Sequence, residues 1–550
     1  MKRFRVIYCC LSLCLLGCSG TMNSNSPVDS LAVIEPFFGL DYTRSERDSA
    51  MENLWQRREQ VKEIHSYSLP NSTAPALDFN PRPAGFELDT DQRPINFGLS
   101  DNVELPADRE QLAFYTVAQL ASLVRTRKIS SVELTQFFIQ RLKTYGDTLQ
   151  CVITLTEELA MEQAKRVDEE IAAGNYRGPL HGIPYGVKDL LALEGYKTTW
   201  GAMPYKDQQV TGTATVIKKL EVAGGVLIVK LTLGALAMGD IWYGGKTKNP
   251  WDLQQGSSGS SAGSASATAA GLVPYAIGTE TWGSIVSPST RCGTTGLRPT
   301  FGRVSRSGAM ALSWSMDKIG PITRSSQDAA IIFETIRGTD NEDRTLVEAA
   351  FNFDADRDLG KLKVAYLKSL FESSSNAQND SVTLAVFRDL GVEMEAITLP
   401  GDIPVGALSM ILASEASAAF DKLTRSNEDD LLVNQKKNAW PNYFRSSRFI
   451  SAADYINANR IRSELIVKVN DLFKGYDAVV CPSFGGDQLL MTNLTGHPCV
   501  VLPNGFNEKG SPTSFSIIGN LYDEASLLEL AHAYQVATHA DEEHPALFMD

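Results

Sequence analysis

Residues 256–271, GSSGSSAGSASATAAG, contain only glycine, serine, alanine and threonine. They run directly into LVPYAIGTETWGS, which reads as an apolar strand ending in a turn. Composition alone suggests a flexible linker. Small side chains are also what a helix needs if its backbone must lie close to a sheet, and Gly271 is then a natural C-terminal stop. This interpretation places Ser260 at the start of a helix, where backbone N–H groups favour negative charge.

The surrounding chain has the composition of a large globular protein. Its 550 residues are 43% hydrophobic and 21% charged, which excludes global disorder and allows a sizeable core. Apolar residues recur at helical spacing from residue 114 onward, and helices then alternate with short apolar strands. Examples of such strands are GVLIV at 225–229, KLKVAYL at 361–367 and YDAVVCPS at 476–483. The alternation predicts an α/β layered domain with a covered sheet, and no fixed repeat suggests a solenoid.

The first 18 residues resemble an export signal. Three basic residues precede the apolar run VIYCCLSLCLLG, which is too short for a membrane span and suits a signal-peptide core. The ending LLGC resembles a bacterial lipobox, which implies a signal peptide over residues 1–17 and lipid attachment to Cys18. A plain secretory signal cleaved elsewhere is the alternative. Either interpretation predicts an extracytoplasmic protein, and the first predicts one anchored to a membrane.

The organisation expected after cleavage is a lipidated tether and extension over residues 18–110, followed by one large domain over residues 111–550. Residues 44–66, RSERDSAMENLWQRREQVKEIHS, predict a helix within the extension. Removing residues 1–17 deletes three basic and no acidic residues, so the net charge moves from −14 to −17. A nucleic-acid partner is therefore not expected, because binding a polyanion requires a basic stripe.

The positions of the cysteines do not indicate a metal site. The cysteines beyond the lipobox are far apart in apolar sequence: Cys151, Cys292, Cys481 and Cys499. No metal-ligand spacing is visible, so buried free thiols are the default, although an oxidising compartment permits a disulfide.

Candidate catalytic bases are histidine and lysine. His181 and His497 stand in HGIP and GHPC turns, where an imidazole more often satisfies backbone groups. No nucleophile elbow of the G-x-S-x-G type is found in the usual strand–turn–helix setting. A lysine can activate serine if burial lowers its pKa from about 10.4 toward neutrality. Lys188 and Lys230 both follow apolar stretches, and the residues alone leave the choice open, since most such lysines pair with a carboxylate or extend to solvent.

Five segments together resemble the amidase signature family, in its order and spacing. They are LHGIPYGVKD (180–189), GSSAGSASATAAG (259–271), GTETWGSIVSPSTRCGTTGLRPTFGRVSRSG (278–308), MDKIGPITRS (316–325) and TNLTGHPCVVLPNGF (492–506). The resemblance extends from residue 111 to the end of the chain. It implies a single α/β/α layered domain with a central mixed, twisted sheet covered by helices. It also implies a serine amidohydrolase that needs no metal or organic cofactor.

The resemblance assigns a Ser-Ser-Lys triad to three positions. Ser284 in TETWGSIV corresponds to the nucleophile, Ser260 to the bridging serine beside a cis peptide bond, and Lys188 to the base. An alternative register puts the bridging serine at Ser257, because GSSG occurs there as well. Ser260 is preferred since it needs no insertion before Ser284.

The same resemblance places an oxyanion hole on consecutive backbone N–H groups: Thr281, Trp282, Gly283 and Ser284. Many family members read DTGGSIR where this chain reads ETWGSIV. Glu280 keeps an acid, Trp282 replaces a glycine, and Val286 replaces an arginine, so one basic group near the nucleophile is lost. Trp282 either narrows the substrate pocket or points into the core, and the sequence favours neither.

Three candidate functions are compatible with these sequence features. The first is a lipid-anchored, extracytoplasmic amidohydrolase of small, peptide or acyl amides. The second is the glutaminase-type subunit of a tRNA-dependent amidotransferase, against which the signal peptide argues. The third is a non-catalytic binding lipoprotein closed by Trp282, which the intact triad positions disfavour. The substrate pocket is expected between residues 340 and 460, and nothing in the sequence indicates the oligomeric state.

Overall fold

The computed structural model describes residues 26–66 and 69–549. The predicted signal peptide over residues 1–17 and the predicted lipidation site at Cys18 lie outside these ranges. The chain divides into two compact units, with the boundary between Leu69 and Pro70. No helix among the described residues combines the length and the apolarity that a bilayer crossing requires.

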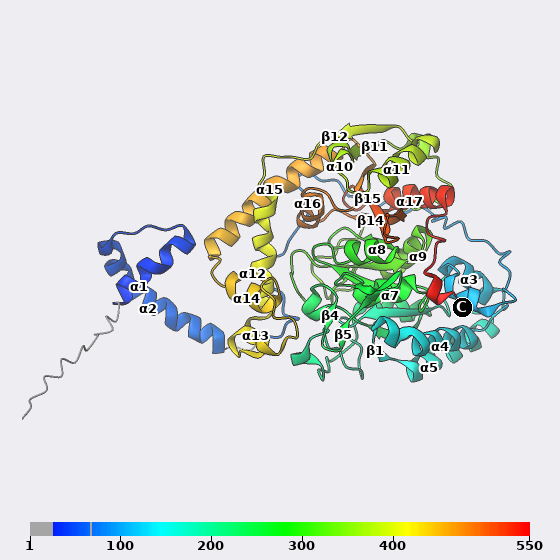
Figure 1. The fold of residues 1–550 in the computed structure, drawn as a ribbon, viewed down its shortest axis with the longest axis horizontal. Helices are drawn as coiled ribbons and strands as arrows, with labels where there is room; N and C mark the ends of the chain where they lie inside the picture. Colours follow the sequence, from blue (N-terminus) through cyan, green and yellow to red (C-terminus); the bar gives the residue numbers. More distant parts are fainter. Residues whose placement is uncertain (1–25, 67–68, 550) are drawn as a thin grey trace, which may run out of the picture. The chain divides into compact units, whose positions relative to one another are not determined.

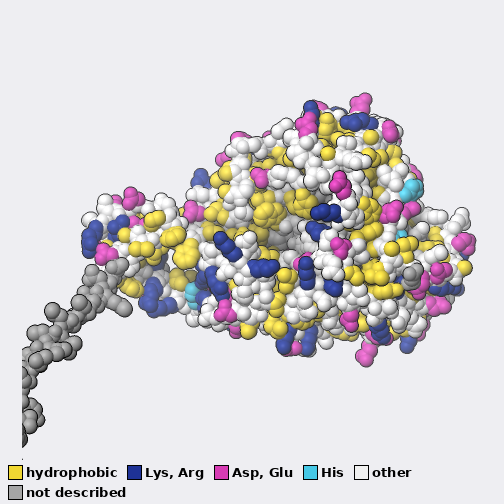
Figure 2. Space-filling model, in the orientation of Figure 1, with side chains coloured by type: hydrophobic (Ala, Val, Ile, Leu, Met, Phe, Trp, Pro, Cys, Tyr) yellow, Lys and Arg dark blue, Asp and Glu magenta, His cyan; other side chains and the backbone are white. Residues whose placement is uncertain are grey.

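The smaller unit is a pair of helices, α1 (Pro27–Ile34) and α2 (Arg44–Ser66), joined through the short 3-10 helix η1 (Glu35–Phe38). α2 confirms the helix predicted from residues 44–66. Arg47 binds Glu35 at 2.8 Å and so ties α2 back to η1. α1 and α2 bury none of their own residues, and apolar side chains such as Phe37, 78% exposed, lie on the surface of this unit (Figure 2). The Arg47–Glu35 ion pair and the Ser26 cap of α1 are among the contacts that stabilise this unit.

The larger unit is built on one mixed sheet of 11 strands, which Figure 1 shows at its centre. In spatial order the strands are β1 (Val152–Leu155), β3 (Val226–Leu231), β2 (Pro184–Lys188), β8 (Ala276–Glu280), β10 (Lys318–Thr323), β9 (Thr295–Arg298), β14 (Cys499–Phe506), β15 (Pro512–Gly519), β13 (Ala478–Pro482), β11 (Val364–Leu367) and β12 (Met394–Ile397). β2 is parallel to β3 and β8, whereas β10 is antiparallel to β8 and β9. The mixed sheet confirms the predicted fold class.

Helices cover this sheet. β2, β3, β8 and β10 are buried at every position, as expected for strands covered on both faces. The helices of the larger unit, of which α12 to α15 pack mainly on other helices, are α3 (Val117–Arg125), α4 (Ser131–Leu149), α5 (Glu157–Ala172), α6 (Thr215–Val222), α7 (Ala262–Ala269), α8 (Val286–Cys292), α9 (Ser326–Ile336), α10 (Lys368–Glu372), α11 (Ala377–Asp389), α12 (Met410–Ala419), α13 (Asp421–Arg425), α14 (Trp440–Ser447), α15 (Ala452–Phe473), α16 (Gln488–Thr495) and α17 (Glu524–Thr538). Two short hairpins, β4–β5 (Ile241–Trp242, Gly245–Lys246) and β6–β7 (Lys248–Asn249, Asp252–Gly256), precede α7.

The linker-like stretch is α7, and every residue of this helix is buried. It packs against β2, β3, β8 and β10. A Cβ atom added at Gly263 would lie 2.5 Å from the backbone nitrogen of Thr232, so the helix approaches β3 more closely than a larger residue permits. Gly271 has φ +63°, the left-handed conformation that ends a helix. The small residues therefore bring the helix backbone onto the sheet, as the sequence suggested.

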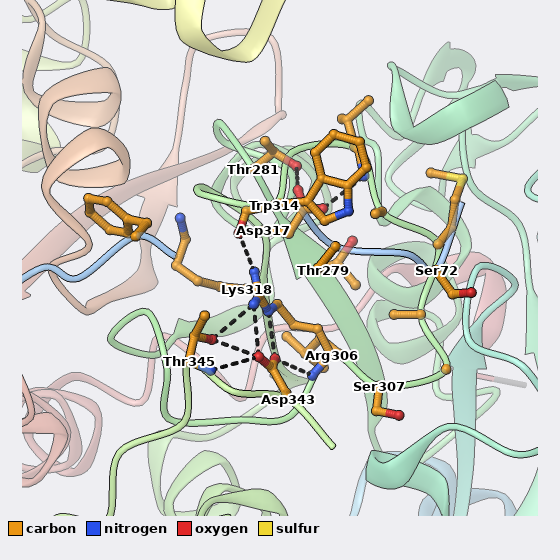
Figure 3. A pocket seen from close by; sticks show the side chains of 18 of the residues that line it. Ser72, Thr279, Thr281, Arg306, Ser307, Trp314, Asp317, Lys318, Asp343 and Thr345 are labelled. Carbon is orange, nitrogen blue, oxygen red and sulfur yellow. Dashed lines mark hydrogen bonds and ion pairs between the residues drawn. The ribbon is translucent and has the colours of Figure 1, made fainter. Parts of the chain in front are cut away.

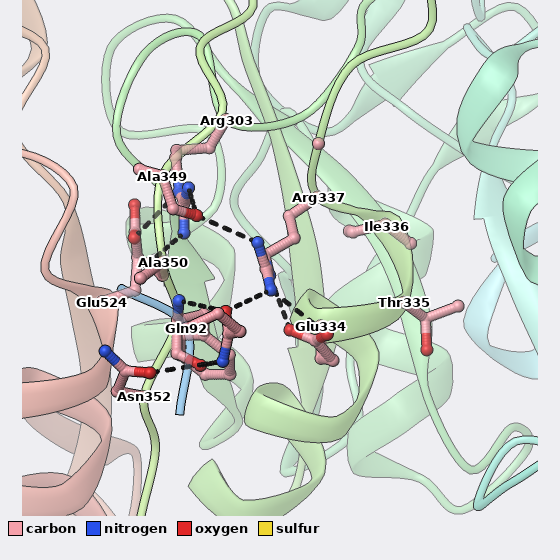
Figure 4. Close-up of polar contacts among 12 residues, drawn as sticks. Gln92, Arg303, Glu334, Thr335, Ile336, Arg337, Ala349, Ala350, Asn352 and Glu524 are labelled. Atoms are coloured by element: carbon pink, nitrogen blue, oxygen red, sulfur yellow. Dashed lines mark hydrogen bonds and ion pairs between the residues drawn. The ribbon is translucent and has the colours of Figure 1, made fainter. Parts of the chain in front are cut away.

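Residues 70–110 are extended chain that belongs to the larger unit. The Gln92 amide donates to the Phe351 carbonyl at 2.8 Å and accepts from the Phe351 N–H at 2.9 Å. Arg337 also donates to the Gln92 side chain, at 2.9 Å (Figure 4). These hydrogen bonds satisfy polar groups of the extension and hold it against segments about 250 residues later in the chain.

Candidate active site

The candidate site lies where β2, β8 and the start of α7 meet. Lys188 is the last residue of β2, and Glu280 is the last residue of the neighbouring parallel strand β8. The carboxyl ends of parallel strands are where α/β enzymes place their ligands. Ser260 lies two residues before the first residue of α7, and the loop of residues 281–284 follows β8. The topology therefore gathers all three predicted triad positions in one region.

Lys188 is fully buried and surrounded by hydroxyl groups. Its Nζ lies 2.8 Å from Ser260 Oγ, 2.8 Å from Thr279 Oγ1 and 3.1 Å from Ser261 Oγ. None of the ion pairs among the described residues includes Lys188. Desolvation lowers the pKa of Lys188 to about 7, against the opposing effect of the Asp317 and Glu280 charges. A large share of this amine is therefore neutral near neutral pH and can accept a proton.

The two alternatives for the bridging serine have different partners. Ser260 contacts the Lys188 amine and follows a cis peptide bond between Gly259 and itself. The Ser257 hydroxyl instead donates to the carbonyl of Ser258 at 2.9 Å. The geometry therefore favours Ser260 as the partner of the lysine.

Ser284 lies beside the start of α7. The backbone N–H of Ser261 donates to the carbonyl of Ser284 at 3.1 Å, which holds the two segments together. Ser261 Oγ in turn accepts from the Thr279 N–H and donates to the Thr279 carbonyl, each at 3.1 Å. Ser284 is buried except for 9% of its surface. This network places the proposed nucleophile at the junction that also holds Lys188.

The loop of residues 281–284 presents unused backbone donors. None of its four backbone N–H groups donates to another described residue. Gly283 has φ +84°, which a residue with a Cβ adopts only with strain. Trp282 is 44% exposed, so its indole does not enter the core. Adjacent free N–H groups form a concavity suited to an anion.

Glu280 binds the backbone immediately after this loop. One carboxylate oxygen accepts from the Ile285 and Val286 N–H groups at 2.9 and 3.0 Å. The other receives Arg298 from β9 and Asn493 from α16, both at 2.8 Å. Burial by itself raises the pKa of Glu280, but the Arg298 charge and these hydrogen bonds outweigh it and lower the pKa to about 2.

Arg298 and Asn493 lie beside the candidate site, and the sequence analysis did not single them out. Both lie within the family-like motifs, at GLRPT and TNLTG. Val286 removes the arginine expected beside the nucleophile, and Arg298 supplies a guanidinium to Glu280 from another strand. Arg298 thus binds the acid that ends β8, whereas position 286 itself carries no basic side chain.

Lys230, the other candidate base, has a different environment. Its Nζ lies 2.8 Å from Asp189 Oδ1, and both side chains are fully buried. It also donates to Thr198 Oγ1 and to the carbonyl of Lys197, each at 2.7 Å. The Asp189 carboxylate accepts further bonds from Thr199. Lys230 thus forms a structural ion pair.

The histidines and cysteines play structural parts. His181 Nδ1 accepts from the Arg177 N–H at 3.1 Å, and His497 Nδ1 lies 2.7 Å from Thr495 Oγ1. Burial lowers the pKa of His497 to about 3. Four buried cysteines, all free, occur in the described part of the chain: Cys151, Cys292, Cys481 and Cys499. Within the described ranges, no group of three or more His, Cys, Asp or Glu residues is arranged to hold a metal.

A cavity of about 180 Å³ opens beside the loop (Figure 3). Thr279, whose hydroxyl contacts Lys188, and Thr281 of the loop both line it. Its other walls come from residues 72–79, 306–319 and 342–345. Figure 2 shows that this face of the larger unit is hollowed near its centre. Of the region between residues 340 and 460, in which the substrate pocket was expected, residues 342–345 line this cavity.

Comparisons with known proteins agree with the fold and with the family resemblance. The family model described as Amidase matches residues 133–492. A glutamyl-tRNA(Gln) amidotransferase subunit of Geobacillus kaustophilus is 33% identical over 488 residues, covering 79% of this chain and 99% of the relative. The corresponding subunit of Methylococcus capsulatus is 34% identical over 471 residues, covering 77% and 97%. The solved native peptide amidase from Stenotrophomonas maltophilia superposes with a TM-score of 0.69 at 27% identity, covering 78% and 98%.

The fold and the buried lysine–serine arrangement define an α/β enzyme of the serine hydrolase class. The chain belongs to the amidase family, whose members act on amide C–N bonds.

Proposed function

We propose that this protein hydrolyses a carboxylic amide through an acyl-enzyme on Ser284, with Ser260 and Lys188 relaying protons. The observation that carries the proposal is the buried Lys188 amine, 2.8 Å from Ser260 Oγ and with its pKa lowered to about 7. An amine that is partly neutral at working pH has the proton affinity a general base requires.

The reaction follows from these groups. Lys188 accepts a proton from Ser260, Ser260 accepts one from Ser284, and Ser284 Oγ attacks the amide carbonyl. The negative charge on the tetrahedral oxygen meets the backbone N–H groups of residues 281–284, each of which can contribute about 3 kcal/mol. The relay in reverse protonates the leaving amine, and water then hydrolyses the acyl-enzyme.

The proposed location is the extracytoplasmic face of a membrane. Residues 1–17 act as a signal peptide, and Cys18 carries the lipid, because the LLGC sequence follows a short apolar run after basic residues. The substrate is then a small-molecule amide outside the cytoplasm. Neither the proposed reaction nor the location involves nucleic acid.

Labelling with a fluorophosphonate probe tests the mechanism. We expect the mature protein to be labelled at Ser284, as located by peptide mass spectrometry. Ser260→Ala is expected to slow labelling by about 10²–10⁴-fold, because the proton relay is broken. Ser257→Ala is the matched control, since Ser257 is equally buried but binds a backbone carbonyl instead of Lys188. Folded parent protein that is never labelled at Ser284 would refute the mechanism.

A second candidate is a glutaminase-type subunit, because the two curated relatives described above are named as subunits of glutamyl-tRNA(Gln) amidotransferase. That function predicts glutamine hydrolysis that rises when the protein is isolated with a partner protein. Purification of the chain from its native cells distinguishes the two. A lipidated, membrane-bound chain active without a partner supports the first proposal, whereas a non-lipidated chain in a stable complex supports the second.

A further inference from the structure

Residues 71–79, which we call the strap, form one side of the cavity. Six of them line it: Ser72, Ala74, Pro75, Leu77, Asp78 and Phe79. The strap precedes the family-matched region, which begins at residue 133. It is therefore an addition of this chain's N-terminal extension to the neighbourhood of the proposed oxyanion loop.

The strap is attached at its two ends. At the first end, the Asn71 side chain pairs with the backbone of Ala311, donating at 2.9 Å and accepting at 2.8 Å. At the other end, the Phe79 ring lies 3.6 Å from the Arg462 guanidinium and packs edge-on against Phe301 at 4.9 Å. Arg462 is buried, so this end is anchored in the core. Both attachments join segments far apart in sequence.

Between these ends the strap is only lightly held. Arg344 donates to the Pro75 carbonyl at 3.1 Å and to the Asp78 carboxylate at 3.0 Å. Arg344 and Asp78 are both largely exposed, and such pairs contribute little to stability. Leu77 lines the cavity yet is 71% exposed to solvent. An apolar side chain in that position gains burial when an apolar group enters the cavity.

The charged side chains of the cavity wall all have partners within the protein. The pairs are Asp78 with Arg344, Arg306 with Asp343, Asp317 with Thr281, Glu342 with Ser307, and Lys318 with the Met316 carbonyl. The rest of the wall is mainly apolar, including Leu190, Met310 and Trp314 (Figure 3). Asp317 and Lys318 bind neutral groups, and burial disfavours the charged form of each, because it raises the pKa of Asp317 and lowers the pKa of Lys318. An apolar group that enters the cavity buries its surface against the apolar part of the wall.

We propose that the strap is the specificity-determining outer wall of a pocket for an uncharged, apolar, side-chain-sized group of the amide substrate. The inference rests on the proposed function and adds the substrate class. The volume of about 180 Å³ lies below the roughly 300–1,000 Å³ typical of drug-sized ligands, which limits the group to small dimensions. Two lining residues connect this pocket to the candidate site: Thr281 of the proposed oxyanion loop, and Thr279, whose hydroxyl contacts Lys188.

Two phenylalanine variants of the full chain test this proposal. Ala74→Phe fills the cavity side of the strap, and Ala76→Phe is the matched control, because Ala76 lies in the same exposed segment but does not line the cavity. The substrates are acetamide, butyramide, hexanamide and benzamide. We expect Ala74→Phe to lower kcat/KM for hexanamide and benzamide, relative to acetamide, by about 10-fold or more. Ala76→Phe is expected to keep the parent ratio.

A binding measurement separates failure of the strap proposal from failure of the proposed chemistry. In a Ser284→Ala background, calorimetry gives the dissociation constants of the corresponding carboxylic acids with each strap variant. Weaker hexanoate and benzoate binding in Ala74→Phe alone supports the strap as the wall. Equal binding and equal substrate ratios in the two phenylalanine variants would overturn it. Absence of fluorophosphonate labelling in the parent refutes the catalytic mechanism instead.

Discussion

At the scale of single residues, the distinguishing feature of the site is a buried lysine without a carboxylate partner. Lys188 and Lys230 follow similar apolar strands, and both amines are removed from water. Lys230 is neutralised by Asp189 at 2.8 Å, whereas Lys188 contacts only hydroxyl and carbonyl oxygens. Lys230 therefore has a structural role, whereas Lys188 is proposed to act as the catalytic base.

Replacing each lysine by methionine distinguishes the two roles. Lys188→Met is expected to lower kcat by about 10²–10⁴-fold, because the base is lost. Lys230→Met is expected to reduce the free energy of unfolding by about 3–5 kcal/mol, because the Asp189 charge is left buried and unpaired. Urea unfolding and amide turnover measure both effects. Equal activity losses in equally stable variants would contradict this assignment.

The pH dependence follows from the same lysine. Because its pKa is lowered to about 7, kcat/KM is expected to rise with pH through neutrality as Lys188 loses one proton, and then to level off. Between pH 7 and about 10.4 the unfolded chain binds more protons at this residue, so its contribution to stability also rises with pH. A pH–rate profile with no ionisation near 7 would argue against Lys188 as the base.

At the scale of elements, Glu280 connects β8, β9 and α16 to the loop that carries the nucleophile. It holds the N–H groups of Ile285 and Val286, which leaves those of residues 281–284 free for an oxyanion. Arg298 and Asn493 hold the carboxylate in place. Glu280 is therefore a positioning residue, acting through the loop.

Glu280→Gln tests this connection. The variant leaves Arg298 buried without its counter-charge, so we expect a loss of about 3–5 kcal/mol in unfolding free energy together with slower turnover. Since the folded pKa of about 2 lies below the unfolded value near 4.3, the parent loses the Glu280 contribution as pH falls from about 4.5 toward 2. Urea unfolding from pH 3 to 6 should show that the parent's advantage shrinks with acid. If the unfolding free energies of the parent and the variant changed with pH in parallel, the Glu280 carboxylate would be excluded as the source of the parent's pH dependence.

At the scale of the whole molecule, the polypeptide combines a small helical unit and a large catalytic unit. The boundary between Leu69 and Pro70 falls within the predicted extension of residues 18–110, and residues 70–110 belong to the larger unit. The strap starts immediately after this boundary.

Cys18→Ala tests the proposed anchor. Without this thiol the chain carries no lipid, so we expect it to move from the membrane to the soluble fraction while its activity per molecule stays the same. Cell fractionation and mass spectrometry of the mature N-terminus measure both outcomes. Equal membrane association of the variant and the parent would refute lipidation at Cys18.

Several features were accessible from sequence. The alternation of helices and apolar strands predicted a covered α/β sheet, and α2, β3, β11 and β13 lie where the patterns placed them. The motif resemblance selected Lys188, Ser260 and Ser284 before any geometry was known. Periodicity and motif spacing depend only on the order of residues along the chain, so they can be seen directly in the sequence.

Tertiary structure decided what depends on partners distant in the chain. Lys188 and Lys230 lie on neighbouring strands, but only Lys230 has a carboxylate partner, Asp189. Arg298 binds Glu280 from β9. The strap is joined to Ala311 across 240 residues, and no periodicity marks it as a cavity wall. The small-residue run reads as a linker in isolation and is a buried helix only because β3 lies against it. Burial and charge pairing arise from such contacts, so only the folded chain determines them.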